Sequence, residues 1–178
     1  MKKFSLLLAM LMLASLMLTA CGQSASSSAA SESAPAESTS EPAEEDEENY
    51  ETGDASLDDP RNGDEIGEKE LLVVSFGTSF NDSRRLTIGA VEGALEKAFP
   101  EYSVRRGFTS QIIIDHVAKR DGEIIDNMQE ALDRAVNNGV KTLVVQPTHL
   151  MNGLEYEEMS EAIAQYSDAF EKVSIGQP

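Results

Sequence analysis

Small polar residues follow three apolar runs of the sequence, and a histidine accompanies one of these groups. They are Ser75, Gly77, Thr78 and Ser79 after the first run, Thr109 and Ser110 after the second, and His149 after the third. Hydroxyl groups and the backbone amides beside a glycine can hold carboxylates or phosphates. A neutral imidazole can ligate a metal ion or take up a proton near neutral pH. The pattern predicts a ligand-binding site in which His149 is the most reactive side chain.

Each of these residues also has a structural interpretation. Serine, threonine and glycine populate turns whatever the function, and His149 could serve only to hydrogen-bond loop carbonyls. The second histidine, His116, is expected on a solvated helix face. The acidic group Glu155, Glu157 and Glu158 favours the start of a helix, where the macrodipole stabilises negative charge, over a metal cluster. The residue pattern alone leaves both interpretations of His149 open.

Regular structure must position these residues, and the spacing of apolar side chains predicts an α/β fold. Strands are expected at residues 71–76, 102–108, 142–146 and 172–175, and helices at 81–98, 111–119, 126–138 and 155–164. Asp126 and Gln129 form a candidate capping box for the third helix. Strands that alternate with helices predict a parallel sheet flanked by helices. Because ligands bind beyond the carboxyl ends of such strands, the polar residues are expected to converge there.

Residues 1–20 have the features of an export signal. Two lysines precede an apolar run over residues 4–18, which leads to Ala20-Cys21-Gly22. This arrangement resembles the bacterial lipobox, in which the cysteine is lipidated and becomes the mature N-terminus. Lipid on Cys21 would anchor the protein to a membrane in an extracytoplasmic location. The alternatives are an ordinary signal peptide with an incidental cysteine and an uncleaved anchor. Because Cys21 is the only cysteine of the chain, its lipidation would leave no thiol for a disulfide or a thiolate metal site.

Residues 21–69 are rich in Ser, Ala, Glu, Pro and Asp and carry most of the negative charge. The formal net charge of the chain is −18, and residues 22–69 hold fifteen acidic against two basic residues. Such a composition cannot bury enough apolar surface to offset the entropy of ordering. It predicts a disordered acidic linker that ends where a folded domain begins at residue 70. Nonspecific capture of cations by the linker is the alternative role, and the acidity argues against a nucleic-acid partner.

Four motifs within residues 70–178 carry a family resemblance. They are Leu72-Val73-Val74-Ser75-Phe76-Gly77-Thr78-Ser79, Phe108-Thr109-Ser110, Arg120-Asp121-Gly122 and His149-Leu150-Met151-Asn152-Gly153-Leu154-Glu155-Tyr156-Glu157. Together they resemble the anaerobic-type sirohydrochlorin cobalt chelatases, and the last motif is the most specific. The resemblance implies a chelatase-like fold of two similar α/β halves with a tetrapyrrole cleft between them. The present sequence would supply the first half and would be truncated at Pro178.

The resemblance implies a metal chelatase, a lyase that inserts Co²⁺ into sirohydrochlorin during cobalamin biosynthesis. It assigns His149 to the metal, together with a glutamate and a histidine that would lie past Pro178. The acidic groups of sirohydrochlorin need hydrogen-bond donors. The candidate substrate-binding residues are those at the strand ends, Ser75, Gly77, Thr78, Ser79, Thr109 and Ser110. Such a ligand set would also accept Ni²⁺, Fe²⁺ or Zn²⁺.

A protein of another class remains an alternative to the enzyme. A membrane-tethered lipoprotein built on the same fold could bind haem-like tetrapyrroles or metal ions without turnover. The sequence also leaves the oligomeric state open, a homo-oligomer included.

Overall fold

The computed structural model describes residues 51–178. The expected signal sequence, the lipidation site at Cys21 and the linker up to residue 50 lie outside the described residues. Within residues 51–178, no helix is both long enough and apolar enough to cross a membrane.

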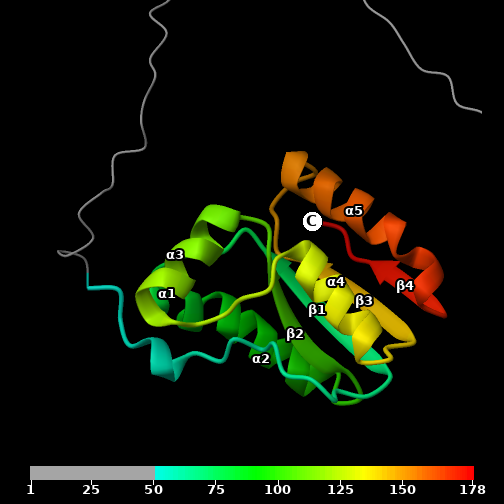
Figure 1. Ribbon diagram of the computed structural model, residues 1–178, viewed down its shortest axis with the longest axis horizontal. Helices are drawn as coiled ribbons and strands as arrows, with labels where there is room; N and C mark the ends of the chain where they lie inside the picture. The colour runs from blue at the N-terminus through cyan, green and yellow to red at the C-terminus, as the bar shows by residue number, and fades with distance from the viewer. Residues whose placement is uncertain (1–50) are drawn as a thin grey trace, which may run out of the picture. The chain divides into compact units, whose positions relative to one another are not determined.

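Four parallel strands form one sheet in the order β2-β1-β3-β4 (Figure 1). They are β1 (Lys69–Ser75), β2 (Ser103–Phe108), β3 (Thr142–Pro147) and β4 (Lys172–Ile175). β1 has a partner on both edges, with Ser75 opposite Phe108 of β2 and Val74 opposite Pro147 of β3. These three strands therefore end side by side. The expected α/β fold with a parallel sheet flanked by helices is confirmed.

Helices cover both faces of this sheet (Figure 1). They are α1 (Asn81–Leu86), α2 (Ile88–Ala98), α3 (Gln111–Asp121), α4 (Met128–Asn137) and α5 (Leu154–Gln165), with the short 3-10 helices η2 (Ala55–Leu57) and η3 (Ser167–Ala169). α4 and α5 pack on the face that carries Leu72 and Val74, and α2 packs on the face that carries Leu71 and Val73. Since β1 is buried on both faces, its sequence is a nearly continuous apolar run.

The helix expected over residues 81–98 is divided into α1 and α2 at Thr87. The Thr87 hydroxyl donates to the Ser83 carbonyl at 2.6 Å, and the Thr87 backbone N–H donates to the same carbonyl at 3.0 Å. A hydroxyl that bonds back to the preceding turn competes with the helical backbone bond and bends or ends a helix. The apolar spacing continues across Thr87 and therefore does not reveal the break.

The capping box of α4 lies one residue later than expected. Asn127 accepts from the Glu130 backbone N–H at 2.9 Å, and the Glu130 carboxylate accepts from the Asn127 backbone N–H at 2.9 Å. Asp126, the expected cap, instead accepts from Arg134 Nε at 2.6 Å and from Arg134 Nη2 at 3.0 Å. The expected pair of Asp126 and Gln129 is therefore wrong, because the buried Asp126 is used in an ion pair.

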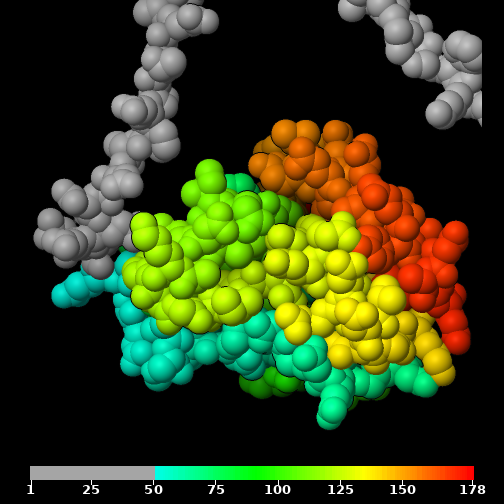
Figure 2. Space-filling model, viewed as in Figure 1, coloured from blue at the N-terminus to red at the C-terminus, as the bar shows by residue number. Residues whose placement is uncertain are grey.

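Residues 51–68, which their composition assigned to the linker, pack against the domain. The Thr52 carbonyl accepts from the Asp82 backbone N–H at 2.9 Å, and the Asp58 side chain is only 3% exposed. Figure 2 shows the cyan atoms of this segment lying against the green atoms of the domain. The folded unit thus begins before residue 70, and this part of the expected disordered linker is structured.

Glu70 is a buried acid at the start of β1. It is 1% exposed, and one of its carboxylate oxygens has no hydrogen-bond partner in the described part of the chain. Burial raises the pKa of Glu70 to about 7, while the nearby Arg105 opposes this shift. The ordinary pKa of a glutamate is 4.5, so the folded protein holds a proton that the unfolded chain has released near neutral pH.

We expect Glu70→Gln to flatten the dependence of stability on pH. The free energy of unfolding of the parent protein should fall as the pH rises from about 4.5 to above 7, by up to about 3 kcal/mol through Glu70 alone. The glutamine variant lacks this titration and should lose correspondingly less stability. Chemical denaturation at about pH 5 and about pH 8 measures the difference.

The matched control is Glu68→Gln, because the Glu68 side chain is 66% exposed. It should keep the parental pH dependence. An equal pH dependence in Glu70→Gln and the parent protein would refute the role assigned to Glu70.

Candidate functional site

His149 follows β3 in a loop that is hydrogen-bonded to the end of β1. The Thr148 backbone N–H donates to the Val74 carbonyl at 2.9 Å, and the Thr148 hydroxyl donates to the Ser75 hydroxyl at 2.8 Å. These bonds continue the pairing of β1 and β3 beyond Pro147, where β3 ends. The position of His149 is therefore set by two neighbouring strands, as expected for a residue at the carboxyl edge of a parallel sheet.

The imidazole of His149 is half-buried, and neither of its nitrogens has a hydrogen-bond partner among residues 51–178. The interpretation that His149 serves to hydrogen-bond loop carbonyls is therefore wrong. Burial lowers the pKa of His149 below its ordinary value, and the negative charge of Glu155 opposes this shift. The ring is thus neutral near neutral pH, and one of its two buried nitrogens carries a lone pair that can bind a cation or a proton.

His149 lines a cavity of about 450 Å³ at the carboxyl ends of β1 and β3. The other lining residues are Ser75, Phe76, Gly77, Ile88, Thr148, Leu150, Met151, Gly153 and Glu155. Much of this lining is apolar and open to solvent, with Leu150 94%, Met151 71% and Phe76 51% exposed. A solvent-facing apolar wall with one imidazole and one carboxylate suits a ligand that has a large apolar surface and a polar centre.

Gly77 allows the loop after β1 to pass close to the end of β2. Its φ is +102°, a backbone conformation that favours glycine. A Cβ at this position would lie 2.5 Å from Cδ2 of the Phe108 ring. The loop that lines the cavity therefore depends on the absence of a side chain at Gly77.

A second cavity of about 260 Å³ lies beside the start of α4 and α5. It is lined by Phe108, Thr109, Asn127, Met128, Gln129, Glu155, Glu158 and Met159. Glu155 lines both cavities. The Thr109 hydroxyl is buried and has no hydrogen-bond partner among the described residues, so it remains available as a donor.

The structure divides the candidate residues into three groups. Ser75, Gly77 and His149 line the larger cavity, and Thr109 lines the smaller one. Thr78, Ser79 and Ser110 line neither of these two cavities.

The last three residues have structural contacts of their own. The Thr78 carbonyl accepts from Arg84 Nη1 at 3.3 Å, and the Ser79 carbonyl accepts from Arg120 Nη2 at 2.6 Å. Ser110 precedes α3, and its backbone N–H donates to the Phe76 carbonyl at 3.3 Å. These residues shape the loops around the site.

Glu155 is the functional candidate that sequence reasoning assigned to another role. It lies in the first turn of α5, where its charge also suits the helix macrodipole. Its separation from His149 by six residues, across a turn at the edge of the sheet, is the signal that could have placed it in the cavity. No cluster of three or more potential metal ligands occurs within residues 51–178.

The fold and the site together define an α/β domain with a cavity at the carboxyl edge of its parallel sheet, the edge at which such domains bind ligands. Comparison with known proteins identifies the family. Residues 69–178 match the cobalt chelatase (CbiK) family, and the chain belongs to it. The chain is also 36% identical over 110 residues to the sirohydrochlorin cobaltochelatase of Salmonella typhimurium strain LT2. This match covers 62% of the present chain and 42% of the Salmonella protein, so the chain spans less than half the length of that relative.

We expect Glu155→Gln to lower the pKa of His149 further. Loss of the negative charge removes the interaction that opposes the effect of burial. Titration of the His149 ring protons by NMR measures the change. Glu157→Gln is the matched control, since Glu157 lies in the same helical turn but lines neither of the two cavities. The same pKa in all three proteins would show that Glu155 does not act on His149.

Gly77→Ala should destabilise the protein by about 1–3 kcal/mol, because the new methyl group meets Phe108 and φ is unfavourable for alanine. Urea denaturation measures the loss. The control is Gly93→Ala in α2, where a Cβ would meet nothing within 4 Å and should stabilise the helix slightly. A Gly77→Ala variant as stable as the parent protein would contradict the close approach of the loop to Phe108.

Proposed function

We propose that this domain takes part in the insertion of Co²⁺ into sirohydrochlorin, with the larger cavity as its part of the reaction site. The observation that carries the proposal is the half-buried His149, whose two nitrogens lack hydrogen-bond partners among the described residues in an apolar cavity. Membership of the cobalt chelatase family and the likeness to the Salmonella sirohydrochlorin cobaltochelatase support the same conclusion.

Metal insertion requires two coupled changes. The macrocycle loses two pyrrole N–H protons, and the cobalt ion exchanges its water ligands for the four ring nitrogens. A neutral imidazole serves both changes, because it can present the ion to the ring or accept one of the protons. The lowered pKa of His149 favours this neutral form. Glu155, which lines the same cavity, would add negative charge that favours the approach of a divalent cation.

The remaining cavity residues suit the shape and charge of the proposed substrate. The exposed side chains of Phe76, Leu150 and Met151 offer apolar contacts to the face of a macrocycle. The unpartnered Thr109 hydroxyl in the adjoining cavity can donate to a carboxylate at the periphery of the ring. We place Thr109 among the substrate-binding residues, with Ser75 and Gly77 forming the wall beside His149.

The choice of metal belongs to the proposal as well. Nitrogen and oxygen ligands bind Ni²⁺ and Zn²⁺ as readily as Co²⁺ and also accept Fe²⁺, so His149 and Glu155 would not select cobalt by affinity. The family supports cobalt as the metal that is inserted.

The proposed location is extracytoplasmic. Lipid on Cys21 would hold the protein at a membrane, and the acidic linker would join this anchor to the domain. The apolar run before Ala20-Cys21-Gly22 supports this arrangement. If lipid on Cys21 anchors the protein, Cys21→Ser should release it from the membrane into the aqueous phase.

The central experiment follows cobalt insertion into sirohydrochlorin by absorbance, using the full chain and its His149→Ala variant. We expect the substitution to lower the rate at least about 100-fold, the range for loss of one group that transfers a proton. His116→Ala is the control, because His116 lies on α3 and lines neither of the two cavities, and it should keep the parental rate.

Equal rates in the parent protein and His149→Ala would remove His149 from the mechanism. Binding of the tetrapyrrole by the parent protein without insertion would favour the alternative class, a binding lipoprotein without turnover.

A further inference from the structure

A cluster of buried charges joins residues 51–62 to the domain, and this segment precedes the part of the chain that matches the chelatase family. Asp58 lies at its centre. Arg84 Nε donates to Asp58 Oδ2 at 2.6 Å, while Arg106 donates to both carboxylate oxygens, at 2.7 and 3.2 Å. The side chains of Arg84 and Arg106 are completely buried, and that of Asp58 is 3% exposed. One carboxylate from outside the family domain thus compensates two buried cations.

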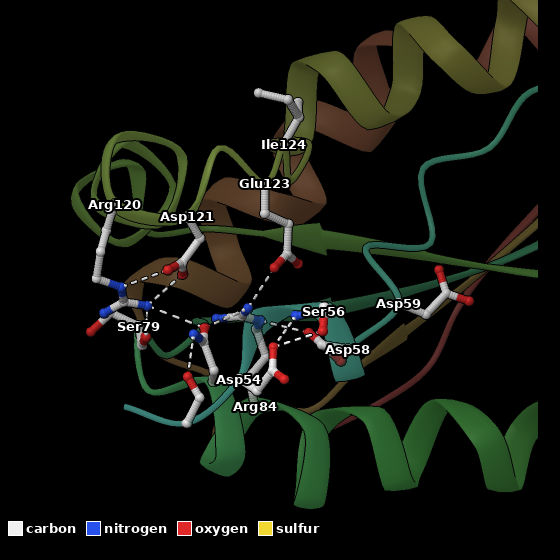
Figure 3. Close-up of polar contacts among 12 residues, drawn as sticks. Asp54, Ser56, Asp58, Asp59, Ser79, Arg84, Arg120, Asp121, Glu123 and Ile124 are labelled. Atoms are coloured by element: carbon white, nitrogen blue, oxygen red, sulfur yellow. Dashed lines mark hydrogen bonds and ion pairs between the residues drawn. The ribbon is translucent and has the colours of Figure 1, made fainter. Parts of the chain in front are cut away.

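Arg84, which donates to Asp58 and to Glu123 (Figure 3), also links the Asp58 carboxylate to the loop that lines the His149 cavity. Its Nη1 donates to the Thr78 carbonyl at 3.3 Å, and its Nη2 donates to Asn81 Oδ1 at 2.9 Å. Arg120 holds the next residue of the loop, since its Nη2 donates to the Ser79 carbonyl at 2.6 Å. Two guanidinium groups therefore fix the backbone of residues 78–79, directly after Phe76 and Gly77 of the cavity wall.

Backbone contacts hold the same segment in place on both sides of Asp58. The Thr52 carbonyl accepts from the Asp82 backbone N–H at 2.9 Å, and the Gly53 carbonyl accepts from Asn81 Nδ2 at 3.1 Å. Further along, Asn62 Nδ2 donates to the Ile124 carbonyl at 2.7 Å. The segment therefore spans the start of α1 and the loop after α3, and two of its contacts fall within three residues of Ser79.

The ion pairs of the cluster indicate that Asp58 acts mainly on Arg84 and on the loop that Arg84 holds. Burial alone would raise the pKa of Asp58, but the hydrogen bonds and charges of Arg106 and Arg84 outweigh burial and hold it below its ordinary value. Arg106 keeps a second carboxylate, because its Nε and Nη2 each donate to Glu92 at 2.8 Å. Arg84 would keep only one hydrogen bond to a carboxylate among the described residues, from Nη2 to Glu123 at 2.7 Å, against the two that Arg106 keeps. Loss of the Asp58 charge should therefore affect Arg84, and the loop that Arg84 holds, more than the rest of the domain.

We propose that residues 51–62 form a positioning strap, in which Asp58 fixes Arg84 and Arg84 fixes the loop at residues 76–80 beside His149. Asp58 is a positioning residue that never touches the substrate. The strap sets the shape of the cavity wall and so governs the affinity for the tetrapyrrole. This effect on affinity rests on the proposed function, whereas the effect on the loop does not.

The test compares the full chain with Asp58→Asn and with the matched control Asp59→Asn. Asp59 is the adjacent carboxylate, and its side chain points away from the cluster (Figure 3). It is exposed, and its Oδ1 accepts from the Arg61 backbone N–H at 2.8 Å. Hydrogen exchange measured by mass spectrometry reports on the loop without any assumption about activity. We expect Asp58→Asn to speed exchange at least about tenfold over residues 76–82 and to leave β1 and β3 protected. Asp59→Asn should match the parent protein throughout.

Kinetics of cobalt insertion provide the second measurement. Asp58→Asn should raise KM for sirohydrochlorin several-fold with a smaller change in kcat, because the substrate-binding wall is displaced while His149 is retained. Failure of the parent protein to insert cobalt would count against the proposed function alone, since hydrogen exchange still decides the role of the strap.

Two results would overturn the positioning role proposed for the strap. Unchanged exchange over residues 76–82 in Asp58→Asn would show that Asp58 does not hold the loop. Equally faster exchange throughout β1 and β3 would show that Asp58 only stabilises the domain.

Discussion

The arrangement of the site depends on one constraint, the pairing of β1 with a parallel strand on each of its edges. The Ser75 carbonyl accepts from the Thr109 backbone N–H at 2.9 Å, while the Ser75 hydroxyl accepts from Thr148. One buried residue therefore connects the loops that follow β2 and β3. Both apolar faces of β1 are covered by helices, so this strand cannot shift its register without exposing its core side chains. This strand pairing sets the positions of His149 and Thr109.

The edge strand β2 adds a second requirement, because it carries two buried arginines that point to opposite faces of the sheet. Arg106 pairs with Glu92 of α2 and with Asp58, and Arg105 lies 3.5 Å from Asp126, which precedes α4. A buried guanidinium without a carboxylate would be costly, so each face must supply acids from the segments packed on it. This requirement explains why an aspartate from a segment outside the family domain is folded into the structure.

Local periodicity was sufficient to predict the strands and the edge of the sheet at which the polar residues gather. It placed His149 just after the third strand because the end of that strand is visible in the sequence. Interactions between distant residues left no such signal. Asp58 belongs to an acidic stretch in which a buried carboxylate and a solvated one look the same, and its arginine partners lie 26 and 48 positions away. The cap of α4 was misplaced because Asp126 and Asn127 are both good caps, and the sequence does not show that Asp126 is used instead in ion pairs with Arg134 and Arg105.

The larger cavity combines two kinds of surface. Phe76, Leu150 and Met151 are exposed apolar side chains, whereas His149 and Glu155 add one imidazole and one carboxylate. This combination suits a ligand that has a large apolar face and a polar centre. The physical contribution of the domain is to keep that imidazole neutral and fixed beside an apolar wall, with no hydrogen-bond partner among residues 51–178.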